Sequence, residues 1–167
     1  LMFSPSPVGV NLKWTEARWL FRRQRQTGFY TEKFLPLFVQ TVLSFDTLAS
    51  LLLAVLLGAV VGTEREAIHK PAGLRTHMLV SLGSCLFTIV SIGFSIDPAR
   101  IAAGIVAGIG FIGAGTIWAE KDKVQGITTA ASLWATAAIG LTVGIGDYPL
   151  AATVTLLVFI ILASRYL

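Results

Sequence analysis

The residues of this chain that could do chemistry are charged side chains at the ends of long apolar segments. Glu64, Arg65 and Arg75 surround one such boundary, and Asp97 and Arg100 flank another. Carboxylates and guanidinium groups in these places can form ion pairs, cap helices or contact phosphate, and converging carboxylates can hold a hard cation. Whether they act together depends on the elements that position them.

Asp46 is the only Asp, Glu, Lys or Arg residue within the first four apolar segments, and an acid inside a membrane segment is a functional candidate by default. Its place near the start of its segment also allows it to cap a helix or to reach the membrane interface. The residues whose loss we expect to matter most, for function or for architecture, are Asp46, Glu64, Arg65, Arg75, Asp97, Arg100, Thr128 and Thr129.

Several chemistries are not supported by these residues. The sequence contains no Ser/His/Asp set, no paired acids and no H-E-x-x-H pattern, so we expect no enzyme and no catalytic residue. His69 and His77 are eight residues apart, which is not a metal-ligand spacing, and the single cysteine, Cys85, excludes an internal disulfide. We expect no bound metal, no cofactor and no nucleic-acid partner.

Composition places the chain in a membrane. Hydrophobic residues make up 54% of it and charged residues 13%, about half of the charged share of a soluble domain. Its apolar segments approach the ~20 residues that cross ~30 Å of hydrocarbon. We therefore predict an all-α polytopic membrane helix bundle of about five transmembrane helices, at 42–63, 76–96, 101–118, 127–145 and 150–166.

Residues 1–41 differ from the rest and form a basic polar tail, which holds six of the thirteen basic residues. The segment 14–25 mixes tryptophan with arginine, which fits either an interfacial segment or a plain cationic tail. No short apolar core with a small-residue cleavage site precedes residue 40, so we expect no cleavable signal peptide. The predicted organisation is a tail at 1–41 and a transmembrane domain at 42–167.

Helix starts and loop charges predict the topology. Asp97 before Pro98, and Asp147 before Pro149, are typical of a capping acid at a helix start, and Thr128 or Thr129 begins the segment at 127–145. Basic residues gather in the loops at 64–75 and 119–126, so the positive-inside rule makes these loops cytoplasmic and the N-terminus external. In this topology, Arg100 cannot share a site with Arg65 and Arg75.

Glycine spacing predicts where helices pack. Small residues four apart form a groove that lets two backbones approach closely in lipid. We expect the first, third and fourth helices to pack tightly in this way, through three pairs of glycines: Gly58 and Gly62, Gly104 and Gly108, and Gly140 and Gly144.

Five segments in order resemble the MgtC/SapB family: GTERE at 62–66, PAGLRTHMLV at 71–80, DPAR at 97–100, GIGFIGAG at 108–115 and GITTAA at 126–131. The resemblance covers roughly 42–165. It implies a bacterial inner-membrane protein with several spans, linked to growth in low magnesium and, in pathogens, to survival inside host cells. Many members carry a soluble domain after the last span. Because this sequence ends at Leu167, we expect the transmembrane domain alone.

Two functions remain open at this stage. The resemblance implies regulation of other membrane proteins, including the ATP synthase, and the small-residue faces suit a non-enzymatic regulator that binds a membrane protein or self-associates in the lipid bilayer. The alternative is a small transporter or channel for an ion such as a divalent cation. Asp46 would then supply the one carboxylate within a span, and a ring of carboxylates in an oligomer, or carbonyls at a helix break, would complete the site.

Overall fold

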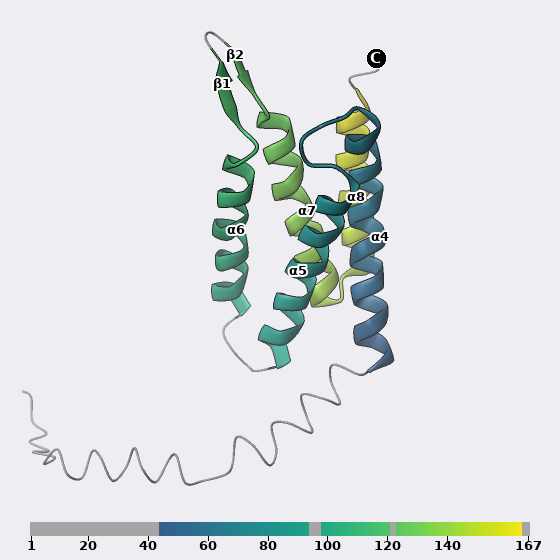
Figure 1. Cartoon of the computed structure of the whole chain (residues 1–167). Coiled ribbons are helices and arrows are strands. Elements are labelled where there is room, and N and C mark those ends of the chain that lie inside the picture. Colours follow the sequence, from purple (N-terminus) through teal and green to yellow (C-terminus); the bar gives the residue numbers. More distant parts are fainter. Residues whose placement is uncertain (1–43, 94–97, 121–122, 165–167) are drawn as a thin grey trace, which may run out of the picture. The chain divides into compact units, whose positions relative to one another are not determined.

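The computed structural model describes residues 44–93, 98–120 and 123–164, all within the unit Thr41–Leu167. In these residues the predicted all-α membrane helix bundle is confirmed, with one short hairpin added (Figure 1). The predicted tail at 1–41 and Asp97 lie outside the described residues. The elements follow in the order α4 (Phe45–Ala67), α5 (Leu74–Gly93), α6 (Pro98–Ala114), β1 (Trp118–Glu120), β2 (Lys123–Gln125), α7 (Ile127–Ile145) and α8 (Tyr148–Ala163).

Three of the described helices, α4, α5 and α7, are long and apolar enough to cross a membrane. The other two, α6 and α8, are apolar but shorter, at 17 and 16 residues. The bounds of α7 agree with the predicted segment at 127–145. The prediction for α6 extended too far, to residue 118, because the chain leaves the helix after Ala114 to form the hairpin.

The hairpin connects α6 to α7. Its strands β1 and β2 pair antiparallel, with Trp118 opposite Gln125 and Glu120 opposite Lys123. Gly126 follows with φ of +89°, and a Cβ at this position would collide with the Thr116 carbonyl oxygen. Glycine is therefore required where β2 turns into α7.

Side chains at the starts of α4 and α8 accept hydrogen bonds from backbone amides that have no partner within the helix. Ser44, rather than Asp46, caps α4: its hydroxyl accepts from the Thr47 amide at 3.2 Å, and Asp46 lies exposed in the first turn. The predicted Asp147 cap of α8 is confirmed, since its carboxylate accepts from the Leu150 amide at 3.1 Å. The N-cap of α7 is Gly126, so Thr128 and Thr129 lie inside the helix.

α5 packs between the glycine-bearing faces of α4 and α7. A Cβ added at Gly58 would lie 2.7 Å from the His77 carbonyl oxygen, and one at Gly62 would lie 2.7 Å from the Leu74 Cα. On α7, a Cβ at Gly144 would lie 2.6 Å from the Thr88 Cβ, and one at Gly140 would run into the Ser81 carbonyl oxygen. The helix backbones approach each other more closely than any side chain would allow.

The third glycine pair behaves differently from the expectation. A Cβ added at Gly104 or Gly108 would meet nothing within 4 Å. α6 packs mainly on α7, where Gly113 faces Ala130, and touches α5 less extensively. The glycines of α4 and α7 thus pack against α5. The glycines of α6 have the same spacing, but no neighbouring helix packs against Gly104 or Gly108.

Replacing Gly140 with alanine is expected to destabilise the bundle. The added methyl group must displace the α5 backbone, and overpacking of this kind costs about 1–3 kcal/mol. Thermal unfolding of the purified protein in detergent measures the loss. The matched control is Gly83→Ala on α5, where a Cβ has open space and no loss is expected. Equal melting temperatures for the two variants would contradict the close α5–α7 contact.

Candidate functional site

The turn between α4 and α5 is built by the backbone and by one carboxylate. His69 adopts a left-handed conformation (φ of 52°), and the amides of His69 and Lys70 donate to the carbonyl oxygens of Glu66 and Arg65 at 2.9 and 3.0 Å. This is the pattern that closes a helix C-terminus. The Glu66 carboxylate then accepts from the Leu74 amide at 3.0 Å and caps α5. A Cβ at Gly73 would collide with that carboxylate, so the glycine makes room for the cap.

An ion pair is buried at the end of α4. The Arg65 guanidinium donates through Nε and Nη2 to Oε2 of Glu64, and the two residues are only 2% and 7% exposed. The second carboxylate oxygen of Glu64, Oε1, is buried without a hydrogen-bond partner among the described residues. Both charges are thus removed from solvent, and each depends on the other for compensation.

His77 connects α5 to α7 beside this pair. Its Nδ1 donates to the Gly73 carbonyl oxygen at 2.8 Å, because a carbonyl can only accept, and Nε2 lies 3.0 Å from the Ser132 hydroxyl. That hydroxyl also lies 2.8 Å from the Thr129 carbonyl oxygen. With a neutral imidazole, the single Ser132 proton can serve only one of these two acceptors at a time. The imidazole is fully buried and ties the starts of α5 and α7 together.

A cavity of about 730 Å³ opens beside the ion pair at this end of the bundle. Its walls come from the α4–α5 turn, the hairpin and the ends of α7 and α8. Arg65 and Lys70 supply its cationic groups, and Thr128 and Thr129 supply hydroxyls, with Thr128 exposed and Thr129 buried. The lining is therefore cationic and polar on one side and apolar, through Ile161 and Leu162, on the other.

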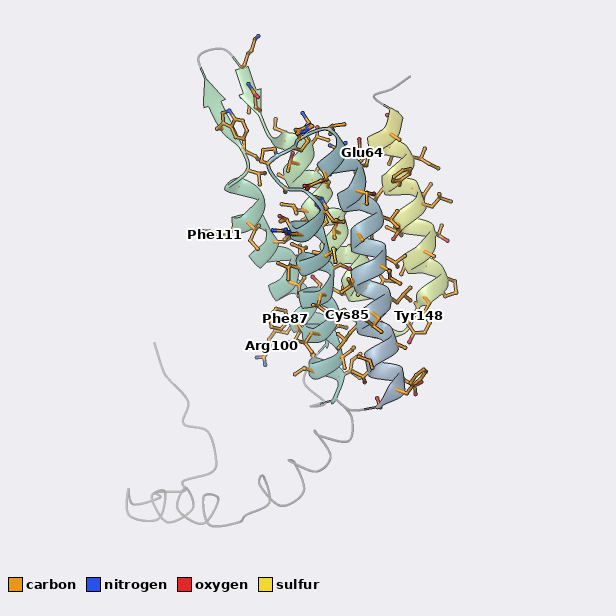
Figure 2. All side chains as sticks on the ribbon, turned by 45° about the vertical axis from the view of Figure 1, so that its right-hand side comes forward. Glu64, Cys85, Phe87, Arg100, Phe111 and Tyr148 are labelled. Carbon is orange, nitrogen blue, oxygen red and sulfur yellow. The ribbon has the colours of Figure 1, made fainter. Side chains whose placement is uncertain are left out.

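The predicted site residues fall into two groups at opposite ends of the bundle. Glu64, Arg65, Thr128 and Thr129 come together at the end that carries the hairpin, and Arg75 lies exposed in the first turn of α5 at the same end. Asp46 and Arg100 lie at the other end; Figure 2 shows Glu64 and Arg100 far apart along the helices. The structure agrees with the expectation that Arg100 shares no site with Arg65 and Arg75.

Metal chemistry finds little support in the part of the chain that the structure describes. No three His, Cys, Asp or Glu side chains gather there as a ligand set. One oxygen of the buried Glu64 carboxylate is held by Arg65, and a guanidinium beside a carboxylate opposes a cation at the same place. Because Glu64 already compensates Arg65, the charged and hydroxyl groups that the cavity offers to an anion, or to the polar backbone of another chain, are those of Lys70, Thr128 and Thr129.

Sequence reasoning gave His77 and Ser132 no functional role, although the structure places both at the centre of the site. A signal was present in α5, where polar residues recur every three or four positions on one face of an apolar helix: His77, Ser81, Ser84, Thr88 and Ser91. All five are buried. Such a stripe inside a membrane helix indicates a face turned to other helices rather than to lipid.

The fold and this site define a class: a polytopic membrane helix bundle whose charged loop motif folds into a buried ion pair and an interhelical histidine contact. The sequence profile of the MgtC family matches residues 51–166. The chain belongs to the MgtC family.

Curated relatives support this assignment. The chain is 47% identical over 121 residues to Protein MgtC of Salmonella typhimurium strain LT2, covering 71% of this chain and 52% of that protein. It is 47% identical over 123 residues to Protein MgtC of Brucella abortus strain 2308, covering 72% and 51%. It is 48% identical over 110 residues to the putative magnesium transporter YhiD of Escherichia coli K12, covering 60% and 51%. The chain spans about half the length of these relatives. No solved structure matches it.

Removing one member of the buried ion pair is expected to cost far more than removing both. Glu64→Gln leaves the Arg65 charge buried and uncompensated, which typically costs about 3–5 kcal/mol. The double variant Glu64→Leu with Arg65→Met removes both charges and should recover most of that loss. Thermal unfolding in detergent compares the two, with exposed Lys123→Gln as a control expected to match the native chain. A Glu64→Gln variant as stable as the native protein would show that the pair does not hold this end of the bundle.

Proposed function

We propose that this chain is a non-enzymatic regulator that binds another membrane protein under magnesium limitation. The names of the relatives, Protein MgtC and putative magnesium transporter YhiD, support the connection with magnesium. A role without catalysis agrees with what the polar interior does: Arg65 compensates the neighbouring Glu64 on α4, and His77 bridges α5 to α7. What the bundle leaves available is a helix surface.

One observation carries the proposal: α6 has a small-residue face that no described element covers. Its four members are spaced three or four residues apart, and all are exposed: Ala103, Ala107, Gly110 and Ala114. We call this the outer stripe. It lies on the side of α6 turned away from α7, which contacts Gly113. Small residues at such spacing let a second helix approach closely in lipid, where dispersion drives association.

The alternative is a small transporter or channel for a divalent cation, favoured by the name of the Escherichia coli relative, putative magnesium transporter YhiD. Hard cations take six or more oxygen ligands. Asp46 is exposed at one end of the bundle, and Glu64 is paired at the other, so a single chain does not bring these carboxylates together. An oligomer would have to assemble the site from several copies.

Gly110→Leu is expected to abolish partner binding while leaving the fold intact. A Cβ added at Gly110 meets no atom within 4 Å in the bundle, but a leucine there blocks the close approach of another helix. A photo-reactive residue at Ala107 should form a crosslinked adduct in cells, and Gly110→Leu should remove that adduct together with growth in low magnesium. Gly108→Leu, equally free of contacts but off the outer stripe, is the control and should keep the adduct.

The mass of the adduct separates the possible partners. An adduct of two copies of this chain assigns the outer stripe to self-association, and a heavier or lighter adduct assigns it to a different membrane protein. Unchanged crosslinking in Gly110→Leu would overturn the use of the outer stripe. Magnesium flux carried by the purified chain in liposomes, and abolished by Asp46→Asn, would replace the regulator with the transporter.

We further propose that the chain lies in a bacterial inner membrane with its N-terminus outside and the 64–75 loop in the cytoplasm. The two ends of the bundle make this testable, because the α4–α5 turn and the hairpin share one end and the start of α8 lies at the other (Figure 1). Asp147 is the N-cap of α8. In a Cys85→Ala background, a membrane-impermeant maleimide should label Asp147→Cys in intact spheroplasts. It should label Lys123→Cys only after permeabilisation. The reverse pattern would invert the topology.

A further inference from the structure

An apolar groove of about 670 Å³ runs between α5 and α6. Leu79, Val80 and Phe87 form part of the α5 wall, and Ile101, Ile105 and Ile112 part of the α6 wall. Val80 and Ile105 also pack on the cluster of Leu133 and Ala137, so α7 supports the floor. The groove is closed on the side of α7 and open on the other, where the bundle would face lipid in a membrane.

The groove exists because three glycines leave it empty. Gly83 on α5 and Gly104 and Gly108 on α6 line it, and a Cβ added at any of them would meet nothing within 4 Å. The glycines of α4 and α7 admit a neighbouring backbone, whereas these three face open space. A flexible apolar molecule can occupy that space without moving the helices.

The width of the groove favours hydrocarbon chains over another helix. From Arg100 to Ile112, α6 advances roughly 18 Å at 1.5 Å per residue. A volume of 670 Å³ over that length leaves a mean cross-section of about 40 Å². A helix with its side chains is 10–12 Å across and needs roughly 80–110 Å². The groove can therefore hold only one side of a helix, whereas acyl chains that run parallel to α5 and α6 fit inside it.

Charge marks one end of the groove. Arg100 is exposed and lines the end that also contains Phe87, and Figure 2 shows these two side chains near each other at that level of the bundle. The other end is formed by Thr76 and Ile112, which carry no charge. A guanidinium can donate two parallel hydrogen bonds to a phosphate. An arginine at the end of a membrane helix places its guanidinium at the interface, where lipid phosphates lie.

We propose that the α5–α6 groove binds a phospholipid of the surrounding bilayer, with its acyl chains along the groove and its phosphate on Arg100. The bound lipid fills the space that the glycines leave and packs α6 against α5. It occupies a different side of α6 from the outer stripe, so lipid and partner protein can bind at the same time.

Retention of lipid by the purified protein tests the proposal. The chain in dodecylmaltoside is incubated with phosphatidylglycerol or with dioleoylglycerol, which has no phosphate, and bound lipid is counted by native mass spectrometry. The native chain should retain phosphatidylglycerol. Gly104→Leu with Gly108→Leu should lower retention of both lipids about tenfold or more, because the leucines fill the groove. Arg100→Gln should lower retention of phosphatidylglycerol alone.

Gly110→Leu is the matched control, since it adds the same side chain to the same helix outside the groove, and it should retain lipid as the native chain does. Should the double variant fail to fold, Gly83→Leu fills the groove from the opposite wall. Equal retention in the filled-groove variants would overturn the site. Equal retention of phosphatidylglycerol in Arg100→Gln would overturn the phosphate contact. A filled groove that loses the protein adduct but keeps its lipid would make the groove a protein-binding surface instead.

Discussion

The close approach of α5 to α4 and α7 is the constraint on which the rest of the structure depends. Hydrocarbon offers helices no hydrophobic reason to associate, so their contact must come from dispersion at short range. Gly58 and Gly62 on one side, and Gly140 and Gly144 on the other, allow that range because a Cβ at any of them would overlap α5. Once α5 is held at this depth, its polar face has to lie inside the bundle.

That burial explains the charged motif between α4 and α5. Thr88, deeper along α5, satisfies its one hydroxyl within its own helix, at 2.8 Å from the Ser84 carbonyl oxygen, whereas a histidine has two ring nitrogens to satisfy. His77 therefore needs partners on two elements, Gly73 in the turn and Ser132 on α7. The turn must then be fixed in place, which Glu66 does by capping α5. Glu66, which looks like a stop-transfer charge in the sequence, thus helps to position one buried imidazole.

The positions of the helices could be predicted from the sequence better than the contacts between them. Apolar length and the Asp147 cap identify helices because these signals are local, and the bounds of α7 were found to the residue. The hairpin was missed because its two three-residue strands are too short to show a period. The spacing of glycines did not show which of them pack against another helix. Gly104 and Gly108 repeat the four-residue spacing of Gly140 and Gly144, yet only the second pair lies against a neighbouring helix. That difference lies in the path of α5, which no local pattern encodes.

α6 takes no part in the close glycine contacts with α5, and its small residues are exposed and free to bind other molecules. One of its ends is tied to α7 through the hairpin and Gly126, and Gly113 packs on Ala130, but its glycines toward α5 remain open. A helix that is packed along one line and open on both sides can take ligands there, because the glycine contacts that hold α5 against α4 and α7 do not involve it. In a protein whose interior charges are committed to packing, recognition is most economically placed on this peripheral helix, where a side chain can be added at little structural cost.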